Sequence, residues 1–242
     1  MLAARAGSTQ NTTGTAETFG TSFSSPVIAG CAALVRQYFE EGWYPCGLKG
    51  CGKPILPAGS LVKAILMNGA QSLTSIQSVP KGPIILSLQD YDSNQGMGLV
   101  NMLQSLPLAN QNNINAFVAN GETIIDGGSH ILIVQTKACN KPILSSTIAW
   151  YDPAGTNGCA SCLLNDLDLF VENIDTSGRR VGNILYPNGV STPDRKNNVE
   201  RVRFQTTAGS RYRITVKAHN LSTQSQSYSL AVAGCFDVVS YA

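Results

Sequence analysis

The chain has 242 residues, of which 43% are hydrophobic and 13% charged, and its formal net charge is +2. The length and apolar content suit one large or two modest domains, while the small net charge without a basic cluster argues against binding to nucleic acid or an anionic membrane. No apolar run reaches about 18 residues, so we expect no membrane span, and the first ten residues lack the apolar core of a signal peptide.

A cluster of hydroxyl residues precedes the first apolar segment. Ser22, Ser24 and Ser25 lead to Pro26, after which small and apolar residues continue to about Glu41. Serine before an apolar run marks a helix start, and proline is tolerated in the first turn. The sequence predicts a buried, central helix, and the serines at its start have two interpretations. The helix is either a plain serine-capped helix or one whose N-terminus stabilises the oxyanion of a serine nucleophile.

Two further segments follow before the pattern changes. Residues 57–70 (PAGSLVKAILMNGA) predict a second, almost wholly apolar helix. Residues 94–102 (NQGMGLVNM) contain two closely spaced glycines and predict a turn after which the chain runs back. After about residue 107, short strands alternate with turn signals. We therefore expect an α/β domain over residues 1–107 and an all-β domain, a jelly roll or β-sandwich, over residues 108–242.

The strands of the second domain follow from alternation of apolar and polar residues. The clearest case is RYRITVKAH, in which Tyr212, Ile214, Val216 and Ala218 face one way. Similar strands are expected at residues 116–119, 123–126, 130–135, 147–151, 166–171, 182–186, 199–205 and 228–233.

The seven cysteines predict three disulfides and one free thiol, namely Cys46–Cys51, Cys159–Cys162, Cys139–Cys235 and the unpaired Cys31. A zinc site on the single C-x-x-C is the alternative, and it needs two further ligands. Disulfides indicate an oxidising compartment. Asn11 and Asn220 begin N-x-S/T motifs, which accept N-glycans if the chain enters the secretory pathway.

Acidic residues in the second domain allow a metal site. Asp166 and Asp168 lie on the same face of a predicted strand, about 7 Å apart. With Asp152, and with Asn165 or Asp194 nearby, they could offer oxygen ligands to a calcium ion. The alternative is an ordinary strand face whose acids are balanced by Arg or Lys.

Residues 20–30 (GTSFSSPVIAG) resemble the nucleophile segment of the subtilisin-like serine proteases, the subtilases of peptidase S8 type. The segments at 57–70 and 94–102, and MLAARAG at the start, resemble the stretches around that segment in the same order. The resemblance implies that Ser22 is the nucleophile of a serine endopeptidase acting on protein or peptide substrates without a catalytic cofactor. It also implies that the backbone N–H of Ser22 belongs to the oxyanion hole and that Thr21 lines it.

The second half carries its own resemblance. IAWYDPAG (148–155), LLNDLDLFVEN (163–173), YRITVKAHN (212–220) and QSYSLAV (226–232) resemble the C-terminal jelly-roll domain of the large alkaline branch of subtilases. The resemblance implies a structural calcium ion somewhere in the protein. It fits a parent protein that is extracellular or lies in the lumen of the secretory pathway.

Two thirds of a catalytic triad are missing from the sequence. Subtilases carry Asp, His and Ser in that order, but no Asp or His precedes Ser22. The only histidines, His130 and His219, lie on predicted strands and suit packing or surface roles. The oxyanion-hole asparagine would also lie upstream.

Three explanations remain open. We favour a fragment of a longer protease. The others are a catalytically dead relic acting as a β-sandwich binding or structural module, and a site completed by another chain. We expect this chain alone to be inactive. We also expect residues 1–107 alone to aggregate or stay loosely packed, and residues 108–242 to fold independently.

Overall fold

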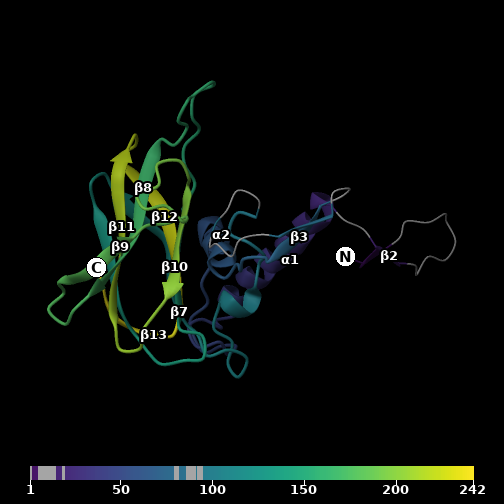
Figure 1. The fold of residues 1–242 in the computed structure, drawn as a ribbon, viewed down its shortest axis with the longest axis horizontal. Helices are drawn as coiled ribbons and strands as arrows, with labels where there is room; N and C mark the ends of the chain where they lie inside the picture. The colour runs from purple at the N-terminus through teal and green to yellow at the C-terminus, as the bar shows by residue number, and fades with distance from the viewer. Residues whose placement is uncertain (1, 5–14, 18–19, 79–81, 86–90, 92–94) are drawn as a thin grey trace.

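The computed structural model describes residues 2–4, 15–17, 20–78, 82–85, 91 and 95–242. In chain order the elements are β1 (Leu2–Ala4), β2 (Thr15–Glu17), α1 (Thr21–Glu40), α2 (Gly59–Asn68), β3 (Ser75–Ser78), β4 (Gly82–Ile85), the 3-10 helix η1 (Met102–Gln104), β5 (Asn115–Ile125), β6 (Ser129–Thr136), β7 (Ile143–Trp150), β8 (Asn165–Ile174), β9 (Arg180–Leu185), β10 (Val199–Gln205), β11 (Arg211–Leu221), β12 (Ser225–Gly234) and β13 (Phe236–Tyr241). The helices lie to one side of a β-sandwich (Figure 1).

The sandwich consists of two antiparallel sheets. One has the strand order β10-β7-β12-β5 and the other β13-β6-β11-β8-β9. The inward residues predicted on β11, Tyr212, Ile214, Val216 and Ala218, are all buried. The predicted strand at 199–205 matches β10, whereas the two predicted at 116–119 and 123–126 form the single strand β5. β13 was not predicted.

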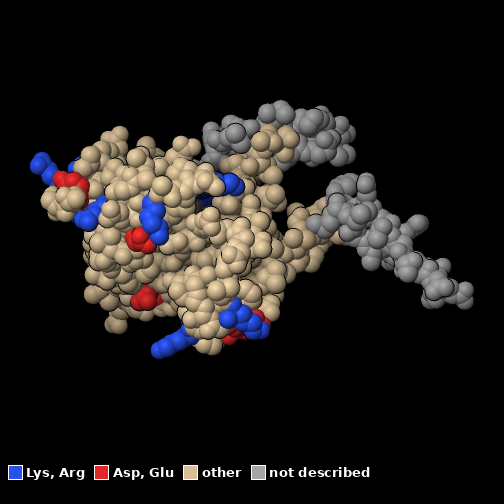
Figure 2. Space-filling view, turned by 90° about the horizontal axis from the view of Figure 1, so that it is seen from below, with Lys and Arg blue, Asp and Glu red and all other residues tan. Residues whose placement is uncertain are grey.

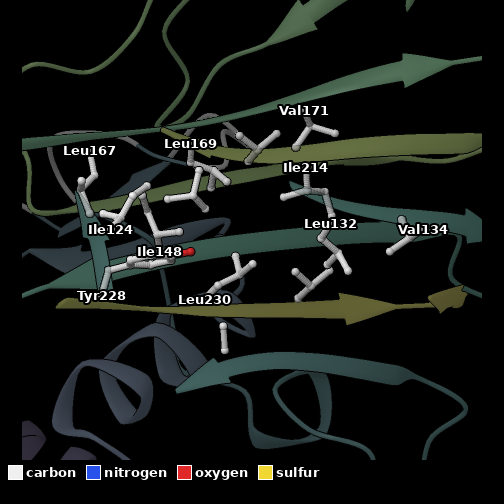
Figure 3. Close-up of a cluster of buried hydrophobic side chains, with 14 of the residues drawn as sticks. Ile124, Leu132, Val134, Ile148, Leu167, Leu169, Val171, Ile214, Tyr228 and Leu230 are labelled. Atoms are coloured by element: carbon white, nitrogen blue, oxygen red, sulfur yellow. The ribbon is translucent and has the colours of Figure 1, made fainter. Parts of the chain in front are cut away.

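Apolar side chains from both sheets fill the space between them (Figure 3). Ile148, Tyr228 and Leu230 come from the four-stranded sheet, and Leu167 and Leu169 come from the five-stranded sheet. Each such side chain, fully buried, contributes on the order of 2 kcal/mol. This inter-sheet core is therefore the main source of stability in the second half of the chain.

A second apolar cluster joins α2 to the outer face of the four-stranded sheet. Leu61 and Ile65 of α2 are fully buried, and the small residues Ala149 on β7 and Ala231 on β12 belong to the same cluster. Small side chains on the sheet let the helix approach closely. The helix α2 and the sandwich thus share a core, although they come from opposite sides of residue 107.

Hydrogen bonds reinforce this contact at the end of α2. Nη1 of the buried Arg201 donates to the carbonyl oxygens of Met67 (2.9 Å) and Ala70 (3.1 Å). The Asn68 side-chain oxygen accepts from Thr147 Oγ1 (2.8 Å). The last carbonyls of a helix have no partner within it, and a cation there also interacts favourably with the helix dipole. Arg201 therefore anchors the C-terminus of α2 to β10.

The α/β expectation for residues 1–107 is not confirmed. Their described part contains two helices, one 3-10 helix and two two-stranded ladders, and every strand pair in the described part of the chain is antiparallel. The expectation that the first helix is buried and central was also wrong. Only Val35, Tyr38 and Phe39 of α1 are buried, whereas Val27 and Ile28 are 43% exposed. The first turns of α1 point away from the sandwich (Figure 1), and no described residue covers them.

Candidate functional site

The helix α1 begins at the predicted nucleophile segment. Gly20, with φ at 133° where glycine is favoured, precedes the first turn, and its carbonyl accepts the N–H groups of Phe23 (3.1 Å) and Ser24 (3.3 Å). The N–H groups of Thr21 and Ser22 donate to no described residue. Unpaired N–H groups at the positive end of a helix stabilise an anion placed beside them. This turn has the donors that an oxyanion requires.

The Ser22 side chain is accessible. Ser22 is exposed, and its hydroxyl forms no hydrogen bond with a described residue. The helix starts five residues earlier than the sequence predicts, so Pro26 lies inside it rather than in its first turn. Proline has no N–H, so it cannot bond to the carbonyl of Ser22 four residues earlier. The backbone around Ser22 is therefore less constrained than in an uninterrupted helix.

The two histidines lie away from this serine. His130 is on β6 and His219 on β11, both in the five-stranded sheet, whereas α2 packs on the four-stranded sheet and α1 packs on α2. His130 Nδ1 is 2.7 Å from the Tyr228 hydroxyl, inside the sandwich. Neither imidazole is placed to take a proton from Ser22, which agrees with the packing and surface roles expected for them.

The carboxylates expected to bind calcium have protein partners. Nη1 of Arg195 forms ion pairs with Asp166 Oδ2 (3.2 Å) and with Asp168. Burial raises the pKa of Asp166, against the effect of the neighbouring guanidinium. Asp152 accepts the N–H groups of Leu164 (2.8 Å) and Asn165 (2.7 Å). The structure thus brings Asp166 and Asp168 together on one guanidinium. This is the alternative to a metal site, in which the acids of the strand face are balanced by Arg or Lys.

No group of three or more His, Cys, Asp or Glu side chains in the described part of the chain is arranged to hold a metal ion. Calcium binding by Asp152, Asp166 and Asp168 stays a prediction that the geometry does not favour.

Glu200 is a buried acid that the sequence analysis missed. Its Oε2 accepts the N–H of Leu169 across the sandwich (2.5 Å), and Oε1 has no partner among the described residues. Burial, with smaller contributions from Asp168 and Asp194, raises the pKa of Glu200 to about 10, so it is protonated at neutral pH. Alternation along VERVRFQ, in which Val202 faces inward, would have placed Glu200 on the same inner face.

Asp194 lies near Glu200 and behaves differently. Burial acts to raise its pKa, but hydrogen bonds from the side chains of Asn188 (2.8 Å) and Asn197 (2.6 Å) and from two backbone N–H groups lower it below the usual range. Asp194 is therefore ionised and fixes the loop between β9 and β10.

The three predicted disulfides are present, and Cys31 is the free, half-buried cysteine. Cys139–Cys235 links residues 96 positions apart, while the other two bonds close short loops. The zinc alternative for Cys159 and Cys162 is therefore wrong in this structure. The motif at Asn11 lies outside the described residues, as does most of the MLAARAG segment.

Charged side chains are sparse on the face drawn in Figure 2, where Lys and Arg lie among Asp and Glu rather than in a patch of one sign. This agrees with the small net charge of the sequence. No helix in the described ranges has the length and apolarity needed to cross a bilayer.

Comparison with known proteins connects the first part of the chain to a peptidase family. Residues 3–98, which include Ser22, match the model of the subtilase family. Three curated proteins of Dictyostelium discoideum are similar over most of the chain. The serine protease/ABC transporter B family protein tagB is 25% identical and covers 94% of the chain, tagA is 27% identical and covers 88%, and tagD is 24% identical and covers 94%.

This chain spans only 12% to 15% of the length of those relatives. Among solved structures, the Yersinia pseudotuberculosis-derived mitogen covers 52% of this chain and 87% of its own at 12% identity. Its TM-score of 0.30 is too low to indicate a shared fold. The sequence similarities support a relationship between the Ser22-containing segment and the subtilase family.

Proposed function

We propose that this chain carries the nucleophile-bearing part of a serine endopeptidase of the subtilase type, followed by a β-sandwich domain. The general base and its orienting carboxylate come from a part of the protein that precedes Ser22 and is not in this sequence. The observation that carries the proposal is the turn at Gly20, where an exposed serine hydroxyl stands at a helix N-terminus beside backbone N–H groups that donate to no described residue.

In the proposed reaction, Ser22 Oγ attacks the carbonyl carbon of the scissile peptide bond while the base takes its proton. The negative charge on the carbonyl oxygen is stabilised by the N–H of Ser22 at the start of α1, with Thr21 lining the hole. The intermediate collapses to an acyl-enzyme on Ser22 as the amine leaves with a proton from the base. Water then releases the acyl group.

The same proposal accounts for the exposed apolar side of α1. In the longer protein, the segment that carries the base would pack against Val27, Ile28 and Leu34, which are 43%, 43% and 56% exposed here. Burial of these side chains removes apolar surface from water and so favours assembly of the complete site. The three disulfides fit a protein folded in an oxidising compartment, so we place the reaction outside the cell or in the secretory lumen.

The test begins with the transcript upstream of the Met1 codon. An open reading frame that encodes an Asp and a His in subtilase-like surroundings supports the proposal, whereas an in-frame stop supports the catalytically dead β-sandwich module. The extended protein is then treated with a fluorophosphonate probe, which reacts with activated serines. We expect labelling that is lost in Ser22→Ala and kept in Ser24→Ala and Ser25→Ala. A folded, extended protein that is labelled equally with and without Ser22 would overturn the assignment of the nucleophile.

A further inference from the structure

The Asn220-Leu221-Ser222 motif lies where β11 leaves the sandwich. Tyr212, Ile214, Val216 and Ala218 alternate along β11 and are all buried, so strict alternation would turn residue 220 inward as well. Instead Asn220 is exposed and Leu221 is 9% exposed. The cause of this change of face lies in the pairing of β11 with β8.

The register of these two strands shifts at His219. Ala218 pairs with Leu167 and Asn220 with Asp166, so two steps on β11 match one step on β8. This is a β-bulge, in which one extra residue reverses the inward and outward order of the residues that follow. The bulge presents the Asn220 amide to solvent while Leu221 returns to the core. An asparagine that had to carry a large polar group could not occupy the inward position.

The neighbouring residues hold this geometry. The N–H of Leu221 donates to Asp126 Oδ1 (3.0 Å), and Ser222 donates its N–H to Asn165 Oδ1 (2.8 Å) and its hydroxyl to the Leu164 carbonyl (2.8 Å). The helix α2 packs on the opposite sheet and α1 packs on α2, so a group on Asn220 does not meet α1 or α2. The Ser222 hydroxyl is engaged in the folded chain, so an enzyme that needs it must act before this contact forms.

We propose that Asn220 is an N-glycosylation site, modified in the secretory lumen before the end of β11 closes against residues 164–165. The donor is an oligosaccharide carried on a lipid diphosphate. A bond forms between Asn220 Nδ2 and the anomeric carbon of the first sugar, the bond from that carbon to the lipid diphosphate breaks, and the amide gives up one proton. The three disulfides provide independent evidence for the compartment in which this transfer occurs.

The experiment expresses the full chain behind a cleavable leader in a eukaryotic secretory host. Asn11→Gln is included in every variant so that the other motif is silent. Only chains from which the leader has been removed, as shown by mass spectrometry, are scored. We expect a gel shift that is reversed by a peptide-N-glycosidase, an amidase that hydrolyses the side-chain amide bond of the glycosylated asparagine, and in ¹⁸O water this leaves an ¹⁸O-labelled aspartate at position 220.

Matched variants distinguish the site from its surroundings. The shift should disappear in Asn220→Gln and Ser222→Ala, but persist in Ser222→Thr, which keeps the hydroxyl and its bond to Leu164. Asp175→Asn creates the motif Asn-Thr-Ser in the exposed turn before Arg179, and it reports access of the transferase to the same sheet. An unmodified Asn220 in leader-free chains, with or without occupancy of the reporter, overturns the proposal.

Discussion

Replacing Arg201 by Met tests the contact that joins α2 to the sandwich. The substitution keeps most of the apolar length of the side chain and removes the guanidinium that binds the carbonyls of Met67 and Ala70. A hydrogen bond from a charged donor contributes about 1.5–3 kcal/mol. Removing the charge also removes the cost of burying it, which offsets part of that loss. We expect the free energy of unfolding to fall by about 2–4 kcal/mol, and the melting temperature by about 5–15 °C.

The assay is urea unfolding followed by tryptophan fluorescence, because the two tryptophans report on different parts of the chain. Trp150 is fully buried in the sandwich core, and Trp43 packs near the end of α1. Measuring Trp43→Phe and Trp150→Phe separately gives one probe for each part. If the contact at Arg201 couples them, both probes report one transition in the parent chain and separate transitions after Arg201→Met.

The control is Arg180→Met, because Arg180 is half exposed and its nearest carboxylate, on Glu172, is 4.0 Å away. We expect it to change stability by less than about 0.5 kcal/mol. If Arg201→Met lowers the free energy of unfolding by no more than Arg180→Met does, the guanidinium does not anchor α2. If the two tryptophans already report separate unfolding transitions in the parent chain, residues 108–242 fold independently of the helices.

Two further changes test the buried acid and the long disulfide. Because the pKa of Glu200 is raised from 4.5 to about 10, the folded chain holds a proton that the unfolded chain releases above about pH 4.5. The contribution of Glu200 to the free energy of unfolding therefore falls as the pH rises between these two values. Glu200→Gln should therefore gain stability relative to the parent between pH 5 and pH 9 in urea titrations, by at most about 1.4 kcal/mol per pH unit, and a pH-independent difference would contradict the assignment. Loss of the disulfide over 96 residues in Cys139→Ala/Cys235→Ala should cost about 4–5 kcal/mol, against about 2 kcal/mol for Cys159→Ala/Cys162→Ala; the reverse order of urea midpoints would refute this loop-entropy argument.

The strands were largely predictable from the sequence because most of them have one face in the inter-sheet core. The bounds of β10 agree with the prediction, and those of α2 differ from residues 57–70 only at the ends. β13 could not be found by alternation, since five of its six residues are exposed. The two strands expected at 116–119 and 123–126 are one strand because Gly121, with φ at 69°, lies where the pairing of β5 with β12 shifts by one residue and the strand continues.

Two features could not be predicted from the sequence: how far the first helix is buried, and which residue pairs with Asp166 and Asp168. The composition of α1 shows that it suits an interior, but not which residues cover it, and the described chain covers only its last turns. Asp166 and Asp168 were correctly placed on one face, yet their partner Arg195 lies in a loop about which strand periodicity says nothing. The catalytic interpretation rests on the local motif around Ser22, which the sequence already contained.

The buried carboxyl of Glu200 also protects an edge of the sandwich. β9 pairs with β8 only from Val171 onward, so the earlier N–H of Leu169 would be open to an added strand. Glu200 occupies that donor from the opposite sheet. An extended peptide, or a second copy growing a fibril, would have to displace an interior side chain before it could accept a hydrogen bond from the Leu169 N–H, which hinders edge-to-edge pairing at this point of β8.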